Sequence, residues 1–90
     1  MGLRTIDLTT KDIRVYPNPV ENILTFDFGK GHLPVQLEVK DLTGRLVWKD
    51  ELLSGKFYLN MESYKNGIYF ITLYENNQFI NTYKIVVQHE

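Results

Sequence analysis

The first candidates for chemistry are the two histidines, because imidazole binds metals and exchanges protons near neutral pH. His32 stands in the loop sequence GKGHLP, and His89 is one residue from the end. Neither has another histidine or a cysteine near it in sequence, whereas zinc needs several such ligands in one place. We interpret both side chains as solvated loop histidines and predict no metal site.

The serines and the acidic residues show no catalytic spacing. Ser54 and Ser63 lack the sharp, glycine-flanked turn that presents a nucleophilic serine. Asp27, Asp41 and Asp50 fall at the ends of apolar stretches or in turns, where an acidic side chain usually bonds to nearby backbone. No D-x-D-x-D run or phosphate-binding glycine loop is present either. We expect no enzyme activity and no cofactor.

The aromatic residues are the remaining candidates for ligand contact, since the chain has six Tyr, five Phe and one Trp. Exposed rings could form a flat platform for a sugar. These residues also satisfy the alternation of strands, so we favour core and cross-strand pairs. Trp48 keeps the alternative open, because its stretch has apolar residues on both faces. A carbohydrate-binding sandwich is thus the alternative function, and it predicts an exposed coplanar aromatic pair, most simply one that involves Trp48.

The bulk composition excludes several classes of partner. Ninety residues suffice for one domain with a thin core. The net charge is −1 and the charges are scattered, so we expect no binding to nucleic acid or to anionic membranes. No apolar run approaches the roughly 18 residues of a membrane span, so we expect no direct membrane insertion. There are no cysteines, and hence no disulfides.

The elements that position these residues are short strands. Apolar residues alternate with polar ones between Gly, Pro and Asn breaks, at intervals of roughly 8 to 12 residues. The strands expected are Ile13–Tyr16, Asn22–Phe28, Val35–Lys40, Arg45–Glu51, Phe57–Met61, Ile68–Tyr74 and Phe79–Gln88. This pattern predicts an all-β, two-sheet antiparallel sandwich of about seven strands. Residues 68–74 are almost continuously apolar, so we expect a central strand covered on both faces.

Five motifs follow one another along this pattern. They are VYPNP at Val15–Pro19, the alternating strand Ile23–Phe28, VKDLTGRLV at Val39–Val47, NGIY at Asn66–Tyr69 and KIVV at Lys84–Val87. In order and spacing they resemble the C-terminal sorting domain of type IX secretion cargo proteins, of the type A class. The likeness covers about residues 13 to 88.

The resemblance implies a module and its route. The fold of the family is an immunoglobulin-like β-sandwich, and its members end larger proteins that reach the periplasm with a signal peptide. The domain then directs its fused cargo to the outer-membrane secretion machinery, and a sortase-like surface protease usually removes it. The resemblance therefore implies a protein in the periplasm in transit and afterwards at the cell surface or outside the cell.

The resemblance also divides the chain and assigns its motif positions. We expect a lead-in or linker at residues 1–12, where cleavage would fall, the sorting domain at 13–88, and a terminal tail at 89–90. The family-motif positions are Tyr16, Pro17, Asn18, Pro19, Gly44, Gly67 and Tyr69.

The last strand is the expected contact with the secretion machinery, because the family's export signal lies largely in its C-terminal segment. The proposed recognition residues are Ile80, Thr82, Lys84, Val86 and Gln88. Recognition could use a free sheet edge, to which a partner strand adds, or the outward face of the strand. The alternative is that this strand serves folding alone. We expect a monomer or a weak dimer, with self-association through exposed edges as a further alternative.

Overall fold

The structure, a computed structural model, describes residues 8–10, 13–29, 35–52 and 55–90 of the chain. The strands are β1 (Leu8–Thr10), β2 (Ile13–Tyr16), β3 (Ile23–Asp27), β4 (Val35–Asp41), β5 (Leu46–Leu52), β6 (Lys56–Asn60), β7 (Gly67–Glu75) and β8 (Gln78–Val87). The all-β prediction is confirmed. One strand was missed: β1 lies in the stretch expected to be a linker, and it pairs antiparallel with β2. None of the described residues forms a helix that could cross a membrane.

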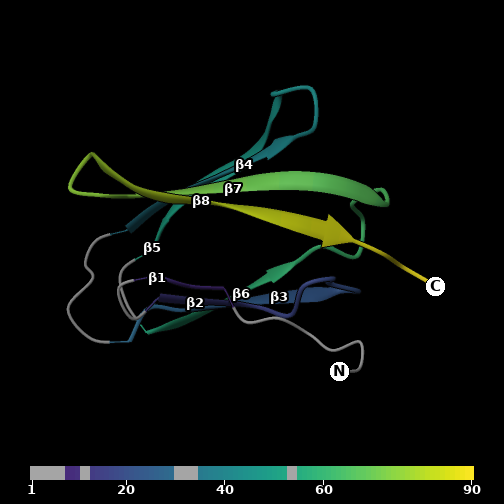
Figure 1. Cartoon of the computed structure of the whole chain (residues 1–90), viewed down its shortest axis with the longest axis horizontal. Helices are drawn as coiled ribbons and strands as arrows, with labels where there is room; N and C mark the ends of the chain where they lie inside the picture. The colour runs from purple at the N-terminus through teal and green to yellow at the C-terminus, as the bar shows by residue number, and fades with distance from the viewer. Residues whose placement is uncertain (1–7, 11–12, 30–34, 53–54) are drawn as a thin grey trace.

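The strands form two four-stranded sheets that face each other (Figure 1). One sheet has the order β1-β2-β3-β6 and the other has the order β5-β4-β7-β8. All neighbouring strands are antiparallel. This division of strands between sheets follows the immunoglobulin-like sandwich, in which the first, second and fifth core strands oppose the third, sixth and seventh. The strand β8, drawn in yellow, lies at the near edge of its sheet in Figure 1.

The core lies between the sheets and is built mainly by alternate residues of β2, β3, β4, β7 and β8, together with residues that flank the strands. Its largest fully buried side chains are Ile13, Val15, Val20, Leu24, Phe26, Phe28, Val35, Leu37, Met61, Ile71, Leu73 and Ile85. Burying a side chain of this size stabilises the fold by about 1.5–3 kcal/mol. Period-two burial thus explains why these short stretches form strands.

Trp48 of β5 and Phe57 of β6 close one side of the sandwich. Their rings stack at 12° with centroids 5.7 Å apart, and both pack against the core. Phe57 also lies 6.0 Å from Phe26, centroid to centroid. A sugar platform needs neighbouring rings whose faces are free. Here the ring faces are turned toward each other, so the pair is a packing contact between the two sheets.

The strand β7 is not covered on both faces, contrary to the expectation from its apolar sequence. Its inward residues Tyr69, Ile71 and Leu73 are buried. Its outward residues Ile68 and Phe70 are only partly buried. The sequence pattern was misleading because an apolar run predicts burial on both sides, and the described residues form two layers without a third over this sheet.

Candidate functional site

The last strand has one face in the core and one face outward over most of its length. Tyr83, Ile85 and Val87 are buried. Lys84 is exposed and Val86 is partly buried on the outward face. Thr82, also exposed, lies on this face, where its Oγ1 is 3.0 Å from Oγ1 of Thr72 in β7. Gln88, just after β8, is exposed as well. The alternation expected for residues 82–87 is confirmed.

The start of β8 departs from that alternation because of a β-bulge. Leu73 pairs with Asn81 and Tyr74 pairs with Phe79, which leaves Ile80 as an additional residue. An additional residue reverses which side chains face the core. Ile80 therefore packs against the core, and its expected place on the outward face is wrong. Phe79 is 62% exposed instead and contacts Tyr74 edge to face at 6.3 Å.

The edge of β8 that faces away from β7 is covered by residues 17–20, which are Pro17, Asn18, Pro19 and Val20. The side-chain amide of Asn18 donates from Nδ2 to the carbonyl of Lys84 at 3.0 Å, and its Oδ1 accepts from the N–H of Val86 at 3.0 Å. The N–H of Val20 donates to the carbonyl of Val86 at 2.8 Å, and the Val20 carbonyl accepts from the N–H of Gln88 at 2.9 Å. We call residues 17–20 the edge-covering segment.

The edge-covering segment crosses from one sheet to the other. It leaves β2 in one sheet, and Val20 forms a parallel bridge with Val87 of the opposite sheet before the chain returns to β3. The prolines lack backbone N–H groups, so they interrupt the ladder of β2 without leaving unpaired donors. The Tyr16–Pro17 and Asn18–Pro19 peptide bonds are both cis. Val20 is fully buried in the core and anchors the segment.

Tyr16, the first of the family-motif positions, ends β2. It is partly buried, and the guanidinium of Arg14 lies 5.0 Å from the centre of its ring. A cation over an aromatic face contributes about 0.5–1 kcal/mol at an exposed site. Tyr16 therefore belongs to the β2 surface, while Asn18 two residues later reaches across to β8.

Gly67 and Tyr69 form the corner where β7 begins. The hydroxyl of Tyr69 donates to the carbonyl of Lys65 at 2.7 Å, and the Tyr64 ring packs edge to face on Tyr69 at 5.4 Å. A tyrosine that bonds back to the chain at the start of this strand is a feature of immunoglobulin-like sandwiches. Burial, and secondarily the neighbouring Tyr69, raise the pKa of Tyr64. Gly67 has φ +152°, which an L side chain rarely adopts.

Gly44, the central glycine of the VKDLTGRLV motif, belongs to a turn organised by Asp41. The Asp41 carboxylate accepts hydrogen bonds from Thr43 Oγ1 at 2.6 Å and from the N–H groups of Thr43 and Arg45 at 3.0 Å. The hydrogen bond from the Thr43 hydroxyl is the largest of the effects that lower the pKa of Asp41. Gly44 has φ +90°, so the glycine serves the turn geometry.

His89 is not a solvated histidine, so that interpretation is wrong. Its backbone N–H donates to Oδ1 of Asn66 at 2.9 Å, and its ring Nε2 lies 2.7 Å from the carbonyl of Tyr64. A carbonyl only accepts, so Nε2 carries the proton in this contact. These bonds hold the residues after β8 against the β6–β7 connection. His32 lies outside the described residues.

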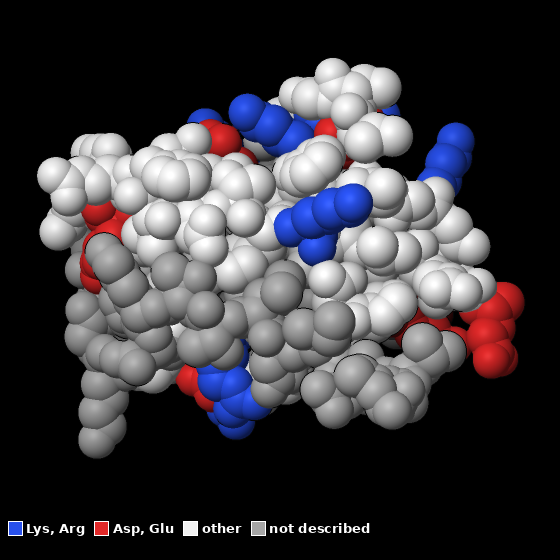
Figure 2. All heavy atoms as spheres, viewed as in Figure 1, with Lys and Arg blue, Asp and Glu red and all other residues white. Residues whose placement is uncertain are grey.

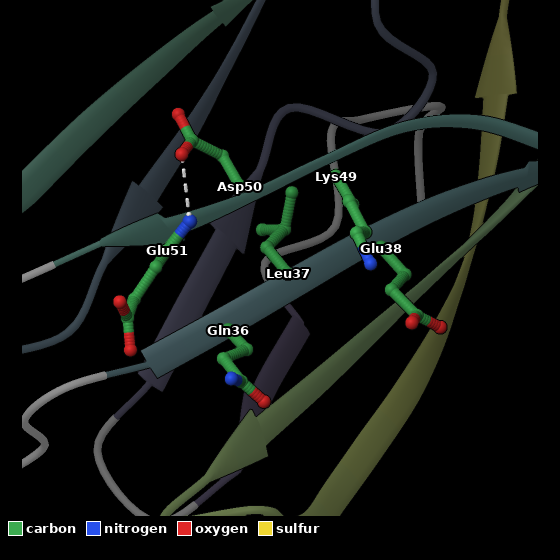
Figure 3. Close-up of a pocket in the computed structure, with 6 residues that line it drawn as sticks. All are labelled: Gln36, Leu37, Glu38, Lys49, Asp50 and Glu51. Atoms are coloured by element: carbon green, nitrogen blue, oxygen red, sulfur yellow. Dashed lines mark hydrogen bonds between the residues drawn. The ribbon is translucent and has the colours of Figure 1, made fainter.

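A shallow hollow on the β4–β5 surface shows no catalytic arrangement. It is lined by Gln36, Leu37, Glu38, Lys49, Asp50 and Glu51. In Figure 3 the three carboxylates point in different directions, and the Asp50 carboxylate accepts the N–H of Glu51 at 2.7 Å. Within the described part of the chain, no group of three or more His, Cys, Asp and Glu residues is placed to hold a metal ion.

The comparison with known families decides what the chain is. The family described as "Secretion system C-terminal sorting domain" matches residues 14–88. The chain belongs to this family. The matched range of the sorting domain begins within β2 and ends just after β8, so it includes the edge-covering segment and the strand that this segment covers. No curated protein matches the chain.

Membership gives the sorting domain its role in outline. It acts in C-terminal sorting by type IX secretion. The domains of this family are sorting signals, which interact with the secretion machinery and are attached to a cargo protein. The protein that carries it is secreted or exposed at the cell surface. Sequence reasoning named Asn18 as a motif position but missed its contact with β8, and it missed Val20. The signal for Val20 was an apolar residue placed directly after the prolines.

Proposed function

We propose that this sorting domain directs a fused cargo from the periplasm through the outer membrane by way of the type IX machinery. The match of the family over residues 14–88 is the observation that carries the proposal. The cargo would travel through the periplasm, and a sortase-like surface protease would then remove the domain by a cut in residues 1–12. The pairing of β1 with β2 favours a cut before Leu8, because a protease needs an extended chain that is free of a ladder.

The recognition residues in this proposal are those that β8 directs outward. Thr82, Lys84 and Val86 lie on one face, and Gln88 follows the strand. Phe79 takes the outward place that the bulge denies to Ile80. These side chains are available to a partner while Tyr83, Ile85 and Val87 hold the strand in the core.

The experiment that tests the proposal fuses residues 1–90 to the end of a fluorescent carrier with a signal peptide, in a host that has this secretion system. We expect the carrier at the cell surface or in the medium. A folded fusion that stays in the periplasm would contradict the proposal. The carbohydrate-binding alternative gains no support, because the rings of Trp48 and Phe57 face each other at 12°.

A further inference from the structure

The edge of β8 is closed to strand addition along its last residues. Backbone groups that point away from β7 belong to alternate residues. The edge-covering segment bonds the carbonyl of Lys84, both backbone groups of Val86 and the N–H of Gln88. Two residues before Lys84, the N–H of Thr82 donates to Oδ1 of Asn81 at 2.9 Å. A partner strand would have to displace Val20, which is fully buried in the core.

The outer face of the same sheet is open instead, and it carries partly exposed apolar side chains at the end where β7 begins, while Phe79 is exposed at the opposite end. Ile68 lies directly across from Val86, and Phe70 lies across from Lys84 on one side and Lys40 on the other. Leu46, across from Lys40, is 47% exposed. We call this group the outer-face patch; its members are Lys40, Leu46, Ile68, Phe70, Lys84 and Val86.

The charges of the outer-face patch are both positive. Lys40 Nζ lies 4.0 Å from Glu38, whereas no carboxylate of the described residues lies within that distance of Lys84. Figure 2 shows mostly uncharged atoms from the side of β8, with one basic side chain near the middle of the view and both basic and acidic side chains toward its margins. An ammonium group that has no carboxylate partner among the described residues, beside partly exposed apolar side chains, fits a carboxylate flanked by apolar side chains.

We infer that the sorting domain docks through the outer-face patch, and not through the edge of β8, onto a protein segment that combines apolar side chains with Asp or Glu. The inference rests on the proposed sorting function and specifies its contact. A membrane or nucleic acid is a poorer fit, because such partners require clustered basic residues and the patch has two separated lysines.

Photo-crosslinking in the secreting host tests the chemistry of the partner. The substitution Phe70→p-benzoylphenylalanine places the crosslinker in the patch, and Tyr58→p-benzoylphenylalanine is the matched control, since Tyr58 is 59% exposed on the other sheet. We expect the crosslinker at position 70 to capture a secretion-machinery peptide that contains Asp or Glu beside apolar residues. Equal capture of that peptide from position 58, a peptide rich in Lys or Arg, or a lipid or glycan adduct would overturn the inference.

Charge reversal separates this inference from the proposed function. Lys84→Glu should lower export of the fused carrier about tenfold, while Lys56→Glu on β6 should leave export unchanged. Lys84→Gln removes the charge but keeps much of the aliphatic part of the side chain, so it should lower export by an intermediate amount. This variant also tests the inference if the Glu variant folds poorly. If the unaltered chain is exported and both Lys84 variants are exported equally well, the inference fails and the sorting function stands. If the unaltered chain is not exported, the sorting function itself fails.

Discussion

Oδ1 of Asn18 accepts the backbone N–H of Val86 at 3.0 Å, and this bond joins the first motif of the domain to its last strand. The Nδ2 group of the same side chain donates to the carbonyl of Lys84 at 3.0 Å. One side-chain amide therefore supplies the donor and the acceptor that a peptide group of a neighbouring strand would supply. An exposed strand edge invites pairing with other chains, and this arrangement removes that risk along the end of β8.

Replacement of Asn18 should weaken this closure. Asn18→Asp keeps an acceptor for Val86 but loses the donor to Lys84 and sets a carboxylate against its carbonyl, so we expect a loss of about 1–3 kcal/mol in the free energy of unfolding. Asn18→Ala should also speed hydrogen exchange of the Val86 N–H. The control is Asn60→Ala, which removes one turn bond to the N–H of Glu62. Unchanged protection of Val86 in Asn18→Ala would show that the side chain does not hold the edge.

Truncation of Val20 tests whether the edge-covering segment is anchored by burial. Val20→Ala should lower the free energy of unfolding by about 2 kcal/mol, because a fully buried side chain leaves a cavity. Val47→Ala, at a residue 40% exposed, should change it by less than about 0.5 kcal/mol. Urea denaturation measures both variants. Equal effects would mean that Val20 is not an anchor.

Removal of the Tyr69 hydroxyl tests the corner before β7. Tyr69→Phe should cost about 1 kcal/mol of stability, since it leaves the Lys65 carbonyl without this hydroxyl donor while the ring stays in place. Tyr58→Phe removes a hydroxyl from a side chain that is 59% exposed and should have little effect. Thermal unfolding of the two variants provides the comparison. A melting temperature for Tyr69→Phe equal to that of the unaltered chain would contradict the role of the corner.

The Asp41 turn should make stability depend on acid pH. The folded-state pKa of Asp41 lies below its ordinary value of 3.8, first through the hydrogen bond from the Thr43 hydroxyl. The carboxylate therefore stabilises the fold above 3.8, and this contribution is lost as the pH falls below that value through the folded-state pKa. Asp41→Asn should reduce the change in stability across this range, compared with Asp50→Asn. The same pH dependence in Asp41→Asn and the unaltered chain would refute this contribution.

Alternation alone predicted most of the sandwich, because residues such as Leu37 and Val39 face the core at every second position. The bulge at Ile80 could not be read from the same pattern, since it depends on how β8 aligns with β7. The contact between Asn18 and β8 was equally hidden, because it joins segments 66 residues apart across the two sheets. The family motifs included Asn18, but its hydrogen bonds to β8 became visible only in the tertiary structure.

The decisive measurement for the sorting function is the location of a signal-peptide-bearing fluorescent carrier fused to residues 1–90. We predict that most of the carrier reaches the cell surface or the medium, and that Lys84→Glu leaves most of it in the periplasm as a folded fusion. Retention of the unaltered, folded fusion in the periplasm would contradict the sorting function.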